Sequence, residues 1–500
     1  MSDIFASLGY GFGVALTPGN VVWALVGSLV GTLIGVLPGL GPVSGIAILI
    51  PVTYGMNPAS AMILLTAMYY GTMYGGSTTS ILVNVPGEAS SVVTALDGYQ
   101  MARQGRAGAA LAIAAISSFV AGTLSVLGLM LFAVPLIGLA LRFGPAEYFG
   151  LMLVGLSSVT SLAGTSLVKA LLSMILGLML STVGVDLSTG MARYTFGVPQ
   201  LLDGIGFLVV AIGLFAVSEV LLAVEAMAGP VRETVPLTRL WLAWRDLAGS
   251  AWAMLRGTLI GFYVGVLPAA GATIASFMSY DVEKRLAKDP TAFGKGDIRG
   301  VAAPEAANNA AAVGNMVPLL TLGIPGSSTT AIMLGALMML GVQPGPLLYQ
   351  KNPDVFWGLI ASMYLGNLML LVLNLPLVGL WVKILAIPER ILYPCILAIS
   401  VIGVFGVSGS TTDLLLACGF GLLGYYMRKH DYPVAPAVLG VVLGGLMEQS
   451  LRQALVLSDG SYRILVQRPI SLVLLLLAAA SLAAPYLLGA LRAKRGEPPR

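Results

Sequence analysis

The 500-residue sequence has few charged residues, one histidine and two cysteines. Asp, Glu, Lys and Arg make up 10% of the chain, against about 25% in ordinary soluble domains. Hydrophobic residues make up 57%, and the mean hydropathy is +0.92. Such a composition excludes an ordinary soluble protein and indicates a membrane protein with several spanning segments.

The scarcity of reactive side chains argues against enzymatic chemistry. His430 lies in an Arg-Lys-His-Asp segment typical of a solvated loop, so it is expected to be neither a metal ligand nor a proton relay. The sequence has no phosphate-binding Gly-x-x-x-x-Gly-Lys-Ser/Thr loop and no His-Glu-x-x-His motif. Cys395 and Cys418 lack metal-ligand spacing and are expected to pack in apolar surroundings. We therefore expect no enzyme, no organic cofactor and no transition-metal site.

The remaining charge gives information about topology rather than about nucleic acids. The net charge is only +4, so no DNA or RNA partner is expected. The N-terminus lacks a basic stretch and a small-residue cleavage site, so no removable signal peptide is expected. Apolar windows of about 20 residues predict ten to twelve spans, several of them interrupted by Pro and Gly. The predicted fold class is an all-α polytopic membrane protein.

A glycine-rich cassette occurs twice in the chain. Gly27-Ser-Leu-Val-Gly-Thr-Leu-Ile-Gly-Val-Leu-Pro-Gly-Leu-Gly41 matches residues 257–271 at 8 of 15 positions. Glycine at every fourth residue predicts close helix packing, and we favour packing over binding for these glycines. Pro38 and Pro268 are expected to interrupt their helices in mid-span, which lipid tolerates only beside a cavity.

A second cassette follows the first in each half. Gly75 to Ser91 contains Pro86-Gly87, and Gly314 to Thr330 contains Pro325-Gly326. Broken helices at corresponding positions of two halves are the best sequence indication of a midplane solute site in a secondary transporter. The order of the cassettes therefore predicts a structural repeat.

Lys and Arg are distributed oppositely around the cassettes of the two halves. The turn 51–58 is uncharged and the loop after the second cassette carries Arg103 and Arg106, whereas in the second half the basic loop is 281–299. Because cytoplasmic loops collect Lys and Arg, this bias predicts two inverted repeats with broken or re-entrant helices. The predicted division is 1–228 for the first half, 229–256 for a connecting helix or linker, 257–467 for the second half, and 468–500 for a C-terminal spanning helix with a basic tail.

The segment 237–257 has an apolar face opposite arginines, which is the pattern of an amphipathic helix. We expect it to lie along the membrane surface between the halves, with a water-exposed linker as the alternative.

The polar tracts inside the cassettes are the candidate binding residues. A helix that begins after Pro-Gly directs backbone N–H groups and its positive dipole end towards a carboxylate. Carbonyl and amide oxygens nearby suit Na⁺. The predicted substrate-binding residues are Ser77, Thr78, Thr79, Pro86, Gly87, Ser90, Asn308, Asn309, Pro325, Gly326, Ser327 and Ser328. The predicted cation-binding residues are Gly39, Gly41, Asn84, Ala270, Gly271 and Asn315.

Alternatives remain open for these polar residues and for two nearby acids. The small side chains would also serve simply to let helices approach and hydrogen-bond one another. Glu88 and Glu305 are the isolated acids nearest the cassettes, and a buried acid suggests a coupling role, whereas an acid at a wet loop end does not.

Several motifs together carry a family resemblance. Residues 35–42, 74–88, 97–100, 304–310 and 320–327 resemble the large membrane subunit of the tripartite tricarboxylate transporters. The resemblance implies a bacterial inner-membrane symporter, Na⁺-coupled, that imports a citrate-like di- or tricarboxylate. It also implies two partners, a small membrane subunit and a periplasmic solute-binding protein.

Energetics agree with a coupled mechanism. Moving a trianion inward against about 100 mV costs roughly 7 kcal/mol, so cations must accompany it. Alternating access would have a repeat-built core carry the site past a scaffold, as in an elevator. A passive carboxylate channel and a non-transporting sensory or assembly subunit are the alternatives.

Overall fold

The computed structural model describes residues 2–37, 40–157, 159, 166–186, 189–226, 242–267, 271–384 and 389–494. This part of the chain is almost entirely helical. The sheet it contains is a short antiparallel pair, β1 (Gly184–Val185) and β2 (Ala192–Arg193). The predicted all-α class is confirmed.

The helices fall into two sets along the chain. In the first half they are α1 (Ser2–Ala15), α2 (Pro18–Val36), α3 (Gly41–Leu49), α4 (Pro58–Val83), α5 (Val92–Met101), α6 (Ala107–Ala140), α7 (Pro145–Ser157), α8 (Leu167–Leu180), α9 (Phe207–Ala211) and α10 (Ser218–Ala226). In the second half they are α11 (Trp244–Val266), α12 (Gly271–Leu286), α13 (Arg299–Gly314), α14 (Met316–Leu322), α15 (Ser328–Met339), α16 (Pro346–Lys351), α17 (Pro353–Asn374), α18 (Val378–Ile384), α19 (Glu389–Ser408), α20 (Thr411–Lys429), α21 (Ala435–Val456), α22 (Ile464–Gln467) and α23 (Pro469–Lys494).

Four helical stretches in the described residues are long and apolar enough to cross a membrane: Pro18–Val36, Ala89–Ala140, Phe207–Glu225 and Pro353–Asn374. Shorter apolar helices of 10–17 residues accompany them, among them Gly41–Thr53 and Ser328–Met339 next to the cassettes. The interruptions explain why these two helices are short, because a helix that stops in mid-span covers only part of the hydrocarbon thickness. The number of ten to twelve spans stays a prediction.

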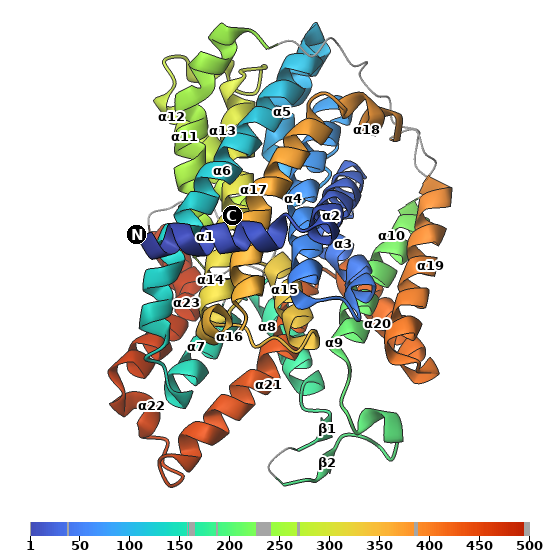
Figure 1. Cartoon of the computed structure of the whole chain (residues 1–500), viewed down its shortest axis with the longest axis vertical. Coiled ribbons are helices and arrows are strands. Elements are labelled where there is room, and N and C mark those ends of the chain that lie inside the picture. The colour runs from blue at the N-terminus through green and yellow to red at the C-terminus, as the bar shows by residue number, and fades with distance from the viewer. Residues whose placement is uncertain are drawn as a thin grey trace.

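The cassette helices form the centre of the molecule. α2 and α3 pack on α4, and α11 and α12 pack on α13, while α6 contacts both groups and α17 packs against α2 and α4. Figure 1 shows α1 lying across this bundle, where it packs against α17. Two outer groups flank the centre: α9, α10, α19 and α20 on one side, and α7, α8 and α21 to α23 on another.

The first cassette interrupts its helix in both halves. α2 ends at Val36 and α3 begins at Gly41, whose φ is 52°. α11 ends at Val266 and α12 begins at Gly271, whose φ is 66°. Pro38 and Pro268 themselves lie outside the described residues. The two predicted interruptions are present at corresponding positions.

The second cassette breaks in the same way in both halves. Asn84, with φ 56° and ψ 30°, ends α4, and Gly323, with φ 72° and ψ 27°, ends α14. Helical structure resumes at Ala89 in one case and at Ser328 in the other. Asn84 and Gly323 are 239 positions apart, as are Pro86 and Pro325, so the backbone repeats as well as the sequence. Opposite orientation of the two halves in the membrane remains a prediction.

The glycine ladders pack directly onto neighbouring backbone. A Cβ atom on Gly31 would lie 2.2 Å from the Met68 carbonyl oxygen, and one on Gly261 would lie 2.2 Å from that of Ala307. Gly31 and Gly261 are 230 positions apart, and their partners Met68 and Ala307 are 239 apart, the offsets of the first and second cassettes. The predicted packing role of the ladders is confirmed, and the same helix pair occurs in both halves.

The structure differs from the predicted surface helix at 237–257. Residues 227–241 lie outside the described part, and α11 runs without a break from Trp244 to Val266. Residues 244–257 of the amphipathic segment are therefore the first part of the second ladder helix, and the boundary at 256 falls inside this helix. Arg256 can lie within this helix because it pairs with Glu283 of α12, with Nη2 2.9 Å from Oε2.

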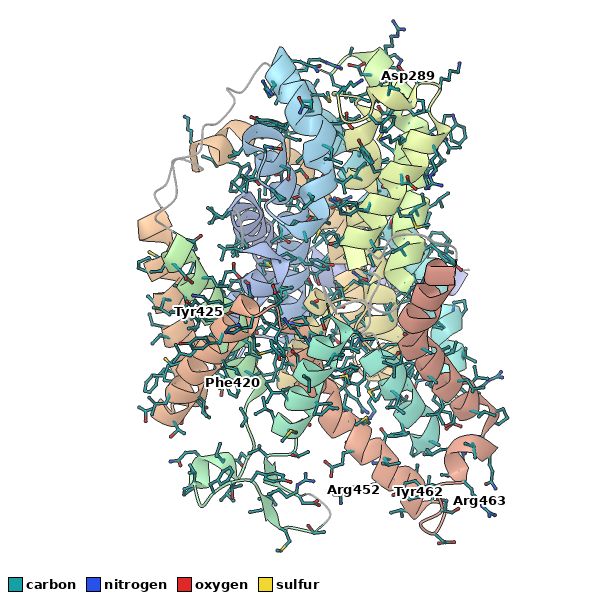
Figure 2. The ribbon with its side chains drawn as sticks, turned by 180° about the vertical axis from the view of Figure 1, so that it is seen from behind. Asp289, Phe420, Tyr425, Arg452, Tyr462 and Arg463 are labelled. Atoms are coloured by element: carbon teal, nitrogen blue, oxygen red, sulfur yellow. The ribbon has the colours of Figure 1, made fainter. Side chains whose placement is uncertain are left out.

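Charged loops lie at opposite ends of the long axis. Figure 2 shows Asp289 at one end, and Arg452 and Arg463 at the other. Hydrogen bonds from Thr291 lower the pKa of Asp289 in its exposed loop. Cys395 and Cys418 are free, and their side chains are exposed on α19 and α20.

Candidate functional site

The second-cassette breaks of both halves meet around one hydroxyl. Tyr69 of α4 accepts a hydrogen bond from Asn315 Nδ2 at 3.3 Å. Ser327 and Thr329 lie beside the same hydroxyl, and the Glu88 carboxylate acts on it through its charge. We call these five residues the junction cluster. It brings together the end of α13, the start of α15 and the break after α4.

Gly326 allows this close approach. A Cβ atom at Gly326 would lie 2.8 Å from Asn315 Oδ1, so any other residue would push the break away from α13. Asn315 Oδ1 is buried and has no hydrogen-bond partner in the described part of the chain. An orphaned buried oxygen is costly unless a ligand completes it. The predicted role of Asn315 in binding a cation stays a prediction.

The two helix starts are capped differently. Glu88 begins the first restart: its carboxylate accepts the Ser91 N–H, and Ser90 Oγ donates to Glu88 Oε1. Ser327, at the corresponding position, accepts the Thr330 N–H at 3.3 Å through a neutral hydroxyl. The positive end of the first restart therefore already faces a carboxylate of its own, whereas the second does not. A carboxylate ligand is better accommodated near Ser327.

A second polar group, the Glu305 cluster, lies where α4 and α5 meet α13. Ser77 Oγ donates to Glu305 Oε2 at 2.6 Å, Thr94 Oγ1 donates to Oε1, and Asn308 Nδ2 donates to Oε2 at 3.3 Å. Glu305 is fully buried and forms no ion pair with any described residue. The sequence left open whether Glu305 is buried or lies at a wet loop end, and the structure shows that it is buried.

The Glu305 cluster continues into a small cavity. Asn309 Nδ2 donates to Asn308 Oδ1 at 2.6 Å and to Ser118 Oγ at 2.8 Å. Ser118 helps to line a cavity of about 10 Å³ whose wall also contains Tyr74, Ser77, Thr78, Leu111, Ala114, Ala115 and Asn374. Its polar side chains come from α4, α6 and α17.

The remaining predicted residues differ in their burial and in their contacts. Thr79 Oγ1 donates to the Gly76 carbonyl inside α4, and Gly87 packs against Gly35 and Gly76. Pro325 is buried, while Pro86 and Ser328 are half-buried at the breaks. Asn84 is exposed at the end of α4. Gly39 and Ala270 lie outside the described residues, and Gly41 and Gly271 begin α3 and α12.

Sequence reasoning missed Tyr69, Ser118 and Asn374. A signal existed for Asn374, since Asn367 and Asn374 lie seven residues apart in the apolar helix α17. Uncompensated amides are rare inside apolar spans and indicate function or helix contacts. Asn367 accepts a hydrogen bond from Tyr74 at 2.6 Å. Tyr69 and Ser118 gave no comparable signal, because single hydroxyl residues are common in such helices.

Asp97 connects the halves outside these clusters. Its carboxylate accepts the backbone N–H groups of Gly294, Gly296 and Asp297 at 2.8 to 3.0 Å, and the Tyr280 hydroxyl at 2.8 Å. The loop that it holds belongs to the charged segment 281–299, which accounts for the nine extra residues between the cassettes of the second half. The charged loop is thus fixed by an acid of the first half.

A wider cavity of about 670 Å³ lies near the opposite end of the molecule and contains no cassette residue. Two arginines and two acids form an ion-pair network in its wall: Arg193 with Asp186 and Glu448, and Arg452 with the same two acids. Positive and negative charges balance in this network.

The described residues contain no group of three or more His, Cys, Asp or Glu side chains that could hold a metal ion. What they contain is two sets of interrupted, closely packed apolar helices that enclose buried polar clusters. Non-helical backbone among apolar helices persists where it is buried in protein or lines a cavity. The fold and the site define a multi-pass helical membrane protein of the solute-transporter type.

Comparison with known proteins gives the family. Residues 21–439 match the model of the Tripartite tricarboxylate transporter TctA family. The chain is 46% identical over 495 residues to an "Uncharacterized 52.8 kDa protein in TAR-I ttuC' 3'region" of Agrobacterium vitis, covering 99% of this chain and 98% of that protein. It is also 47% identical over 215 residues to an "Uncharacterized protein in TAR-II ttuC' 3'region" of the same organism. This match covers 43% of this chain and 89% of that protein. No solved structure matches.

The protein belongs to the Tripartite tricarboxylate transporter TctA family. The resemblance drawn from its motifs is confirmed. It is therefore a component of a tripartite transporter and a multi-pass membrane protein, and the family is not one of enzymes.

Proposed function

We propose that this chain is the translocating subunit of a secondary symporter that imports an organic di- or tricarboxylate together with Na⁺ across the bacterial inner membrane. The observation that carries the proposal is the junction cluster, where interrupted helices from both halves meet around the Tyr69 hydroxyl. Such convergence of broken helices is the feature on which secondary transporters build their solute sites.

The chemistry of the breaks supports an anionic cargo. The start of α15 offers backbone N–H groups and a positive dipole end beside the neutral caps Ser327 and Thr330. The acid at the matching position of the first half, Glu88, favours a cation instead. Each half would contribute a different part of the site, and the inverted orientation of the repeats would place both parts near the middle of the membrane.

Coupling to cations follows from the charge that is moved. Each negative charge carried inward against about 100 mV costs roughly 2.3 kcal/mol, so a trianion does not accumulate without accompanying cations. The tripartite family supports two partners: a small membrane subunit and a periplasmic solute-binding protein that delivers the cargo. A repeat-built core moving past a scaffold would provide alternating access.

Uptake into proteoliposomes tests the proposal. The full chain, with and without a periplasmic binding protein, is reconstituted, and entry of labelled citrate is measured with and without an inward Na⁺ gradient, followed by a panel of other carboxylates. The proposal requires gradient-dependent accumulation. Uptake that ignores the gradient would indicate a channel, and cargo binding without flux would indicate a sensory or assembly subunit.

A pair of neighbouring tyrosines supplies a matched control. Tyr69→Phe removes the hydroxyl at the junction, and we expect uptake to fall about tenfold, the effect of losing one buried hydrogen bond in the translocating state. Tyr70→Phe removes a buried hydroxyl that has no partner in the described residues and should leave uptake unchanged. Equal uptake by the two variants would exclude the junction as the site.

A further inference from the structure

The cavity beside the Glu305 cluster has a wall of five polar side chains and three apolar ones, Leu111, Ala114 and Ala115. Its polar wall consists of Tyr74, Ser77 and Thr78 of α4, Ser118 of α6 and Asn374 of α17. At about 10 Å³ it has room for a single guest of the size of one water molecule. The guest would be surrounded by hydroxyl and amide groups inside an apolar helix bundle.

Three of these groups direct hydrogen atoms to other residues. Tyr74 donates to Asn367 Oδ1 at 2.6 Å, and Ser77 donates to Glu305 Oε2 at 2.6 Å. Asn374 Nδ2 donates to the Leu370 carbonyl at 3.0 Å, which fixes the orientation of the amide. A guest in the cavity can therefore meet lone pairs of Tyr74, Ser77 and Asn374, and lone pairs bind a cation.

Asn374 gives independent support. Its side chain is 5% exposed, and Oδ1 has no hydrogen-bond partner in the described part of the chain. A buried carbonyl oxygen without a partner is costly in an apolar surrounding. A cation coordinated by Asn374 Oδ1 would remove the free-energy cost of burying this oxygen without a partner.

The charge of the neighbourhood favours a monovalent ion. Glu305 contacts the cavity wall through Ser77, and none of the described ion pairs includes Glu305. One positive charge balances this single carboxylate. Calcium and magnesium sites use more carboxylate oxygens than this region offers. The volume admits one monovalent ion, and the proposed symport makes that ion Na⁺.

We propose that the cavity between α4, α6 and α17 binds one Na⁺ through Ser77, Ser118 and Asn374, with Glu305 supplying the balancing charge. This assignment rests on the proposed symport and names its cation site, which differs from the predicted set around Gly41, Gly271 and Asn84. Because Ser77 belongs to the first half and Glu305 to the second, the ion would hold the two halves together.

Binding is tested on the purified full chain in detergent, without transport. NaCl is titrated against choline chloride at constant ionic strength, with KCl in parallel, and the midpoint of thermal unfolding is recorded. A ligand that binds only the folded state raises the midpoint in a saturable way. We expect saturable stabilisation by Na⁺ and a much weaker effect of K⁺.

Two independent variants and one control locate the site. Asn374→Leu and Ser118→Ala each remove one ligand on a different helix, and each should weaken the apparent Na⁺ affinity about tenfold. Ser117→Ala removes a buried hydroxyl next to Ser118 that has no hydrogen-bond partner among the described residues and does not line the cavity, and this variant should bind Na⁺ like the parent. If either Asn374→Leu or Ser118→Ala fails to fold, the other decides.

Each outcome has a clear meaning. Na⁺ stabilisation that is lost in the cavity variants but kept in Ser117→Ala supports the site. Equal Na⁺ affinity in all variants, or no response to Na⁺, overturns it. If the cavity binds Na⁺ but citrate uptake ignores the Na⁺ gradient, the symport proposal fails and the site stands. If uptake requires Na⁺ while the cavity variants bind it normally, the site fails and the symport stands.

Discussion

Replacing Gly31 with alanine tests the contact that defines each half of the molecule. The new methyl group would lie 2.2 Å from the Met68 carbonyl oxygen and 2.8 Å from Met68 Cα. Both atoms belong to the backbone of α4, so no side-chain rotation relieves the overlap. Since carbon atoms reach optimal contact only at about 3.5 Å or more, α2 and α4 must separate by roughly 1 Å. Overpacking of this kind costs about 1–3 kcal/mol, and we expect the upper part of that range.

The repeat predicts an equal effect in the other half. Gly261→Ala places its methyl group 2.2 Å from the Ala307 carbonyl oxygen and should destabilise the protein as much as Gly31→Ala does. Gly419→Ala in α20 is the control, because its methyl group meets no atom within 4 Å. It should leave stability unchanged or raise it by about 0.5–1 kcal/mol through helix propensity.

The assay is unfolding by sodium dodecyl sulfate, followed by tryptophan fluorescence in mixed micelles. The free energies of unfolding of the two ladder variants are compared with those of the parent and of Gly419→Ala. The reasoning is refuted if Gly31→Ala is as stable as the control. A large loss in only one ladder variant would contradict the equivalence of the halves.

Three further changes probe other contacts. Asp97→Asn replaces charge-assisted hydrogen bonds from three backbone N–H groups with neutral ones. We expect the free energy of unfolding to fall by about 2–3 kcal/mol and limited digestion to cleave the loop 293–297 faster. An unchanged digestion rate would contradict the role of Asp97. Arg256→Met leaves Glu283 buried at 2% exposure without its partner and should cost about 3–5 kcal/mol, whereas the double variant Arg256→Met/Glu283→Leu should recover most of that stability in thermal unfolding. Ser327→Ala removes the cap of α15 and should cost about 1 kcal/mol while Ser327→Thr keeps it, as followed by the same unfolding measurement.

Proline and glycine made the interruptions predictable from the sequence. Proline lacks a backbone N–H, and a glycine ladder has meaning only where two helices touch, so the cassettes indicated both the breaks and the close packing. Left-handed backbone at Gly323 and Gly41 also fits glycine, which adopts positive φ at little cost.

The partners of the buried polar groups were not predictable in the same way. Glu305 meets Ser77 and Thr94 from the other half of the chain, more than 200 positions away, and no local pattern records that contact. The amphipathic segment before Gly257 was misread because its arginines resemble a solvent-facing stripe. The sequence does not show that Arg256 has a buried acid, Glu283, on the next helix.

The glycine contacts also determine where the molecule can move. Carbonyl oxygens of α4 and α13 sit against glycines of α2 and α11 so closely that sliding within either pair would drive backbone into backbone. Each pair must therefore travel as one stiff unit. Any relative movement must therefore occur at the interface between the two pairs. There the hydroxyl groups of Ser77 and Thr94 donate hydrogen bonds to Glu305, and such hydrogen bonds can exchange partners without a change in covalent geometry.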